Sequence, residues 1–85
     1  MDTDVRSAYL TATGTAYPAA TRVRGAFVTG TGTAEFRNGG GSGTLLLTLN
    51  NTGTSNVYIP ANGIRFTTDV HVTVTGLTAI TVFYG

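Results

Sequence analysis

The sequence predicts an all-β protein: an antiparallel β-sandwich of about eight short strands, arranged like a jelly roll or Greek key. Apolar and polar residues alternate with a period of two along most of the 85 residues, as in strands that bury one face. Turn-forming residues separate these runs at the short spacing seen in sandwiches and barrels. No window has the apolar spacing of a helix, and the chain is predicted to be a single domain over residues 1–85.

The first two predicted strands cover residues 5–13 and 22–29. In the first strand, Ala8 and Leu10 fall on one face and Tyr9 on the other. In the second strand, Val23 and Phe27 are expected to face the core. Tyr17-Pro18-Ala19 is predicted to separate the two strands as a turn.

The next two predicted strands cover residues 33–37 and 44–49. Thr29-Gly30-Thr31-Gly32 is predicted to be a tight turn before the first of them, since glycine permits a positive φ. Leu45, Leu47 and Leu49 are expected to share one face of the second strand. The glycine-rich stretch 38–43 lies between two strands and is predicted to be a hairpin loop.

Four further strands are predicted at residues 56–59, 63–67, 70–75 and 78–84. Residues 50–55, 60–63 and Gly76 supply the turns between them. The apolar members of the alternation define the expected core. This predicted core consists of Phe36, Leu45, Leu47, Phe66, Val72, Val74, Ile80 and Val82.

Composition argues against several functional classes. There is no cysteine, and one histidine with four acidic residues offers few other ligands, so neither disulfides nor a metal site is expected. All five cations are arginine and the net charge is +1, which is too little positive charge for a nucleic-acid stripe. No apolar run spans a membrane and no signal peptide is recognisable, so we expect neither membrane insertion nor secretion.

Catalysis is not expected either. Asp69 and His71 are two residues apart on a predicted strand and resemble half of a catalytic triad. No serine or threonine stands in a nucleophile-elbow pattern, and the glycine-rich stretch lacks the Lys-Ser/Thr ending of a phosphate loop. The sequence therefore predicts no catalytic, metal or cofactor-binding residues and no cofactor.

Self-association is the expectation that composition favours. A chain this short, without a disulfide or a metal, buries a limited share of its surface, and partner subunits are a usual supplement. Only 11% of the residues are charged, which protects a free surface poorly against contact. The candidate subunit interface contains Arg22, Arg24, Glu35 and Tyr84.

Two interpretations of these residues stay open. Arg22 and Arg24 share a strand face and are expected to pair with Glu35 on a neighbouring strand, either in a subunit contact or as a solvated edge. Tyr17 and Tyr58 lie beside prolines, where a sugar-stacking site is the alternative. A small carbohydrate-binding module and an intracellular interaction domain are therefore alternatives to a structural subunit.

Several segments resemble a group of very short proteins encoded by tailed bacteriophages, which are virion-associated. The resemblance is carried by 24–28, 33–40, 44–49, 59–66, 72–74 and 80–85, and it covers about residues 23–85. It is a pattern of strands and turns and brings no site residues with it.

The resemblance implies a non-enzymatic structural protein of a phage virion, assembled in the host cytoplasm. Decoration or stabilisation of the capsid is the expected role, with a tail or fibre position as the alternative. The expected partners are further copies of the chain, as a trimer by analogy with decoration proteins, and other virion proteins such as the major capsid protein.

Overall fold

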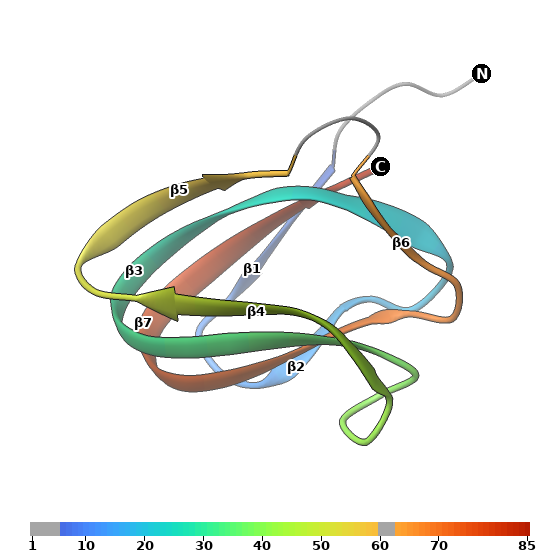
Figure 1. The fold of residues 1–85 in the computed structure, drawn as a ribbon, viewed down its shortest axis with the longest axis horizontal. Helices are drawn as coiled ribbons and strands as arrows, with labels where there is room; N and C mark the ends of the chain where they lie inside the picture. The colour runs from blue at the N-terminus through green and yellow to red at the C-terminus, as the bar shows by residue number, and fades with distance from the viewer. Residues whose placement is uncertain (1–5, 60–62) are drawn as a thin grey trace.

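The computed structural model describes residues 6–59 and 63–85. These residues form seven strands in one antiparallel sheet, and none of them lies in a helix, so no membrane-spanning helix is found among them (Figure 1). The strands are β1 (Arg6–Leu10), β2 (Gly14–Tyr17), β3 (Thr21–Asn38), β4 (Thr44–Asn51), β5 (Thr54–Tyr58), β6 (Ile64–Phe66) and β7 (Val70–Tyr84). The prediction of an all-β antiparallel fold is confirmed.

Two long strands, β3 and β7, form the centre of the sheet. They pair with each other along nearly their whole length, from Val23 opposite Tyr84 to Arg37 opposite His71. The other edge of β3 is occupied in turn by β6, β5 and β4, and the other edge of β7 by β1 and β2. Every short strand is therefore hydrogen-bonded to one of the two long strands.

Both long strands bend sharply near their middle. Eighteen residues of straight strand would span about 59 Å, whereas the longest dimension of the molecule is 36 Å. Gly30 in β3 and Gly76 in β7 adopt positive φ values of 97° and 79° at the bend, which other residues rarely adopt. A Cβ atom on Gly32 would collide with the carbonyl oxygen of Thr75, so the two backbones approach each other more closely than a side chain permits.

The bend folds the sheet over itself into two layers (Figure 1). We call the first layer the one made by β1, β5, β6 and the halves of the long strands that follow Gly76 and precede Gly30. The second layer contains β2, β4 and the remaining halves. A single core lies between the layers, and its buried members are Val23, Ala26, Val28, Ala34, Phe36, Phe66, Val70, Val72, Leu77, Ile80 and Val82.

Asn51 ties the turn between β4 and β5 to the bend. Its buried side-chain amide donates hydrogen bonds to the carbonyl oxygens of Gly30, at 2.6 Å, and Gly53, at 3.0 Å. The backbone N–H of Gly30 donates to the same Gly53 oxygen at 2.8 Å. The turn that carries the chain from the second layer to the first is therefore anchored on the residue where β3 bends.

The observed strands differ from the predicted ones at the glycines. Thr29-Gly30-Thr31-Gly32 and Gly76 are bends inside continuous strands, because the ladder between β3 and β7 resumes on both sides of them. The four strands predicted on either side of these glycines are therefore two strands in the structure, β3 and β7. Residues 14–17, which lie outside every predicted strand, form β2. The predicted turn at 60–63 and the start of the first predicted strand lie largely outside the described residues.

Bulges explain why Leu45 and Phe27, which were expected to face the core, are exposed. The register between β3 and β4 shifts after Phe36, so that Leu45 lies opposite Arg37 and is 43% exposed, while Leu47 is only half-buried. A second shift between Val23 and Gly25 turns Phe27 outward, to 41% exposure. One extra residue in a strand reverses the face of every residue beyond it. All seven strands belong to one sheet, and the jelly-roll arrangement remains a prediction.

The close approach at the bend predicts a sharp difference between two glycines. We expect Gly32→Ala to lower the free energy of unfolding by about 1–3 kcal/mol or more, because its Cβ has no space against Thr75. Gly14→Ala is the matched control, since the nearest atom to its added Cβ is 3.8 Å away. Urea denaturation of both variants measures the difference. Equal stabilities would show that the long strands are not in contact at the bend.

Burial predicts a second pair of outcomes. Ile80 is fully buried, and Ile80→Ala should cost about 2–5 kcal/mol of unfolding free energy. Leu45 lies beyond the bulge and is exposed, so Leu45→Ala should change the same quantity by no more than about half a kcal/mol. A large loss of unfolding free energy in Leu45→Ala would contradict this register and favour the one that simple alternation predicts, in which Leu45 faces the core.

Candidate functional site

The outer face of the first layer carries an aromatic side chain from each of four neighbouring strands. In antiparallel sheets, residues directly opposite each other point to the same face. Phe27 lies between Thr81 on β7 and Asn56 on β5, and Thr81 in turn lies opposite Tyr9 on β1. The intervening residues of β3, Ala26 and Val28, are buried in the core, so Phe27 and its neighbours face outward.

The adjacent row of the ladder completes the set. Phe83 lies opposite Ser7 on one side and Gly25 on the other, and Gly25 lies opposite Tyr58. A Cβ atom on Gly25 would lie 3.8 Å from the ring of Phe83, so this ring extends over the glycine. We call Tyr9, Phe27, Tyr58 and Phe83 the aromatic face; they alternate between two rows and cross about 14 Å of sheet at the usual strand spacing.

These aromatic residues are accessible to a partner. Tyr58 is 81% exposed, Tyr9 69% and Phe27 41%, while Phe83 is half-buried between them. The other outward positions of the same rows and of the next row are Ser7, Gly25, Thr29, Thr54, Asn56, Ala79 and Thr81. None of these positions is charged, so a partner would meet aromatic rings, hydroxyl groups and an amide.

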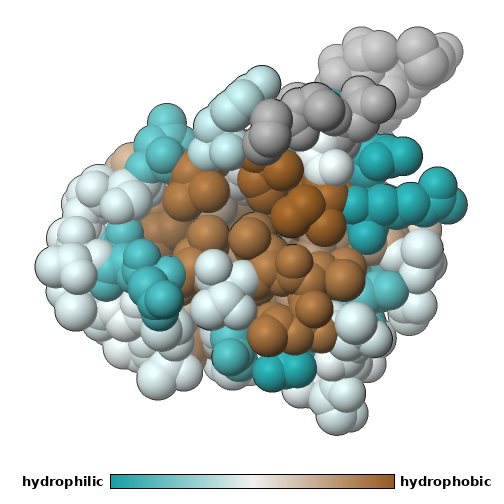
Figure 2. Space-filling view, viewed as in Figure 1, coloured by the Kyte–Doolittle hydropathy of each residue, from teal (hydrophilic) through white to brown (hydrophobic). Residues whose placement is uncertain are grey.

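A second apolar surface lies between β4 and β5, the edge strands of the two layers. Leu47, Leu49 and Val57 on these strands pack against the core and stay partly exposed, as does Ile64 on β6. Figure 2 shows apolar side chains gathered between the two edges in the same view as Figure 1. The layers are therefore not sealed along this edge by the described residues.

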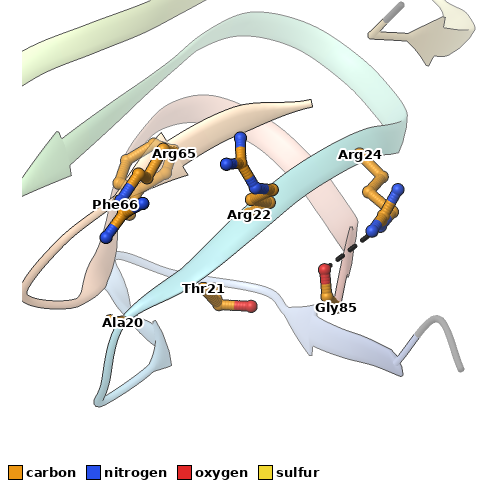
Figure 3. Close-up of a pocket in the computed structure, with 7 residues that line it drawn as sticks. All are labelled: Ala20, Thr21, Arg22, Arg24, Arg65, Phe66 and Gly85. Carbon is orange, nitrogen blue, oxygen red and sulfur yellow. Dashed lines mark hydrogen bonds between the residues drawn. The ribbon is translucent and has the colours of Figure 1, made fainter. Parts of the chain in front are cut away.

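Arginine residues line a pocket of about 370 Å³ at one end of the first layer. Arg22 and Arg65 are directly opposite each other on β3 and β6, and Arg24 lies two residues further along β3 (Figure 3). The Nε atom of Arg24 donates a hydrogen bond of 3.1 Å to the backbone oxygen of Gly85. Phe66, which is fully buried, Ala20 and Thr21 complete the lining.

The structure separates the residues that the sequence grouped as a subunit interface. Arg22 and Arg24 share the pocket, but Glu35 lies on the same strand as both, beyond the bend, and the prediction that it lies on a neighbouring strand is wrong. Within the chain, Glu35 forms an ion pair with Arg37, and the Nη2 atom of Arg37 lies 3.2 Å from the Oε1 atom of Glu35. Tyr84 is nearly buried, with its ring centroid 4.7 Å from that of Tyr17. Whether any of these residues contacts a second subunit remains a prediction.

Asp69 has a structural role beside His71. One carboxylate oxygen of Asp69 accepts hydrogen bonds from the backbone N–H groups of Gly39, at 2.8 Å, and Gly40, at 3.2 Å. No hydrogen bond to the His71 side chain occurs among the described residues, and His71 is half-buried with its Nε2 atom facing Gly41. The pair therefore holds and covers the glycine-rich loop.

No cluster of three or more potential metal ligands occurs within residues 6–59 and 63–85. Comparison of the chain with protein-family models, with curated proteins and with solved structures finds no match. The proposed function therefore rests on the chemistry of the exposed side chains.

Sequence reasoning found only part of the aromatic face. Alternation placed Tyr9 outward, and the position of Tyr58 beside a proline marked it as a candidate for stacking. Phe27 was assigned to the core, because the bulge at Val23 to Gly25 is not visible in the alternation. The signal that could have found it is Gly25, because a glycine in the interior of a strand often marks a bulge.

The arrangement around Asp69 predicts different outcomes for two substitutions. Asp69→Ala should lower the free energy of unfolding by about 1–3 kcal/mol, because two backbone donors lose a charged acceptor. His71→Ala should change it by no more than about half a kcal/mol and leave association with partners intact. Chemical denaturation and sedimentation measure both effects. Loss of biological function in a folded, assembled His71→Ala variant would contradict the structural role and favour a catalytic pair.

Proposed function

We propose that this protein is a non-enzymatic structural module that works as a subunit of a larger protein assembly, using the aromatic face as its contact surface. The aromatic face is the observation that carries the proposal. Tyrosine and phenylalanine are enriched, and charged residues depleted, at the centre of protein interfaces. Tyr9 and Tyr58 are also among the most exposed large side chains in the described part of the chain.

The energetics support an association role. Aromatic residues dominate interface energetics because each ring removes a large area from water without a charge to desolvate. The rings project from paired strands, so the backbone beneath them is already ordered and its entropy is not lost on binding. The partly exposed apolar residues of β4, β5 and β6 offer a second area for contact.

The assembly we propose is the virion of a tailed bacteriophage. The resemblance of residues 23–85 to short virion-associated phage proteins supports this choice. Decoration or stabilisation of the capsid, as a trimer bound to the major capsid protein, is the proposed role, with a tail or fibre position as the alternative. A low-charge surface suits a subunit held in an ordered shell, where neighbours cover it.

Glycan binding is a second candidate, favoured by what surrounds the rings. Ser7, Asn56 and Thr81 lie on the same face as Tyr9 and Phe27. Flat aromatic rings beside hydroxyl and amide groups suit a sugar, whose apolar C–H face can stack while its hydroxyl groups form hydrogen bonds. The aromatic face is therefore compatible with either proposed function, and the identity of its ligand distinguishes a subunit contact from glycan binding.

Sedimentation and capsid-binding measurements test the proposal. We expect the isolated protein to form an oligomer, to bind purified phage capsids, or both. The double variant Tyr9→Ser/Tyr58→Ser should weaken that association about 30-fold, which corresponds to a loss of about 2 kcal/mol at an interface hot spot. Leu45→Ser is the matched control, because it removes an exposed apolar side chain on the other layer.

The outcomes separate the candidates. Weakened association in the double variant only, with its fold intact by circular dichroism, supports the contact surface. A protein that stays monomeric at high concentration and ignores virion components, but binds glycans on an array in a way that needs Tyr58, would replace the proposal with the carbohydrate-binding module. Equal weakening by Leu45→Ser would assign the contact to general apolar exposure and contradict the aromatic face.

A further inference from the structure

The arginine pocket concentrates positive charge without compensation. Three of the five arginines of the chain line it, and no acidic side chain of residues 6–59 and 63–85 does. The two acidic residues that the structure describes are engaged elsewhere, Glu35 with Arg37 and Asp69 with the glycine-rich loop. Arg22, Arg24 and Arg65 therefore have no acidic side chain as a partner among the described residues.

The placement of Arg22 and Arg65 is electrostatically unfavourable. They are direct cross-strand neighbours, and like charges at such positions repel and destabilise a sheet. Val23 and Phe66, the residues next to them on β3 and β6, are fully buried, so both arginines lie on the solvent side of the sheet. Folding therefore places two positively charged residues at directly paired positions of the sheet.

Donor groups in the pocket are available for such an anion. Each guanidinium has five N–H donors in a planar fork that matches a phosphate or carboxylate group. Only one of these donors, Nε of Arg24, has a hydrogen bond to the described residues, at Gly85. Figure 3 shows Arg22 and Arg65 on adjacent strands, with their guanidinium groups pointing in different directions, and the Arg24 side chain directed toward Gly85.

We propose that this pocket binds a doubly charged tetrahedral oxyanion, the phosphate monoester group of a ligand. Three positive charges with no acid in the lining favour a dianion over a monovalent carboxylate. Bidentate hydrogen bonds from guanidinium forks to such a group are short and strong, and their geometry is specific. The anion would relieve the repulsion between Arg22 and Arg65, so that binding also stabilises the fold.

The pocket is open and large enough for more than a free ion. Its volume of about 370 Å³ falls in the range of small-molecule sites. Tyr58, which lies opposite Gly25 and so one position from Arg24, places the aromatic face beside it. A phosphorylated sugar would fill this space better than inorganic phosphate. This inference does not depend on the association role, since the pocket uses different side chains.

Titration by NMR with inorganic phosphate and with a sugar phosphate, at an ionic strength held constant with sodium chloride, tests the proposal. We expect saturable shifts at the pocket residues and a rise in the thermal midpoint. Arg65→Gln should weaken phosphate binding at least tenfold. Arg37→Gln, which removes the same charge outside the pocket, should change it less than twofold.

The stability of the variants gives an independent readout. Without anion, Arg65→Gln should melt at a higher temperature than the original protein, because the cross-strand repulsion is gone, and added phosphate should no longer raise that temperature. Tighter binding of the sugar phosphate identifies an ester as the source, and equal binding identifies the free ion. Acetate binding as tightly as phosphate, equal losses from Arg37→Gln, or affinity that grows with oligonucleotide length would each overturn the proposal.

Discussion

The close backbone contact at the bend of β3 and β7 is the constraint on which the other features depend. Gly30, Gly32 and Gly76 let two long paired strands turn together, at positions where a side chain would meet the opposite backbone. Because the strands pair on both sides of the bend, the two layers form from one sheet and share one core. Asn51 adds the side-chain hydrogen bonds that fasten the β4–β5 turn to the same place.

The bend also separates the two candidate binding surfaces from polar contacts that stabilise the fold. The first layer carries the aromatic face and, at its end, the arginine pocket, whereas the second layer carries the Glu35–Arg37 ion pair and the loop held by Asp69. The low overall charge increases the chemical contrast between the two candidate surfaces. Few side chains of this protein are charged. The uncharged aromatic face therefore favours contacts with protein or sugar, whereas the three clustered arginines favour an anion. One small sheet can therefore present two chemically different surfaces side by side.

The candidate sites depend on details that the alternation of residues does not encode. The period of two identified Tyr9 as outward-facing and Phe36, Phe66, Val72, Ile80 and Val82 as core, and the structure agrees. It failed at Phe27 and Leu45, because a bulge reverses the faces beyond it and depends on how a strand fits its partner. The pairing of Arg22 with Arg65 joins residues 43 positions apart, and no local pattern predicts which strands will be neighbours.

Composition and alternation by themselves determined the all-β antiparallel class, most of the core and the scarcity of charge, because these follow from local preferences and burial of one strand face. Only the tertiary structure decided what the glycines do. Gly30 and Gly76 look like turn residues in the sequence, yet the strands continue through them. Whether a positive φ ends a strand or bends it depends on whether the partner strand bends at the same place, and that is a property of the paired backbones.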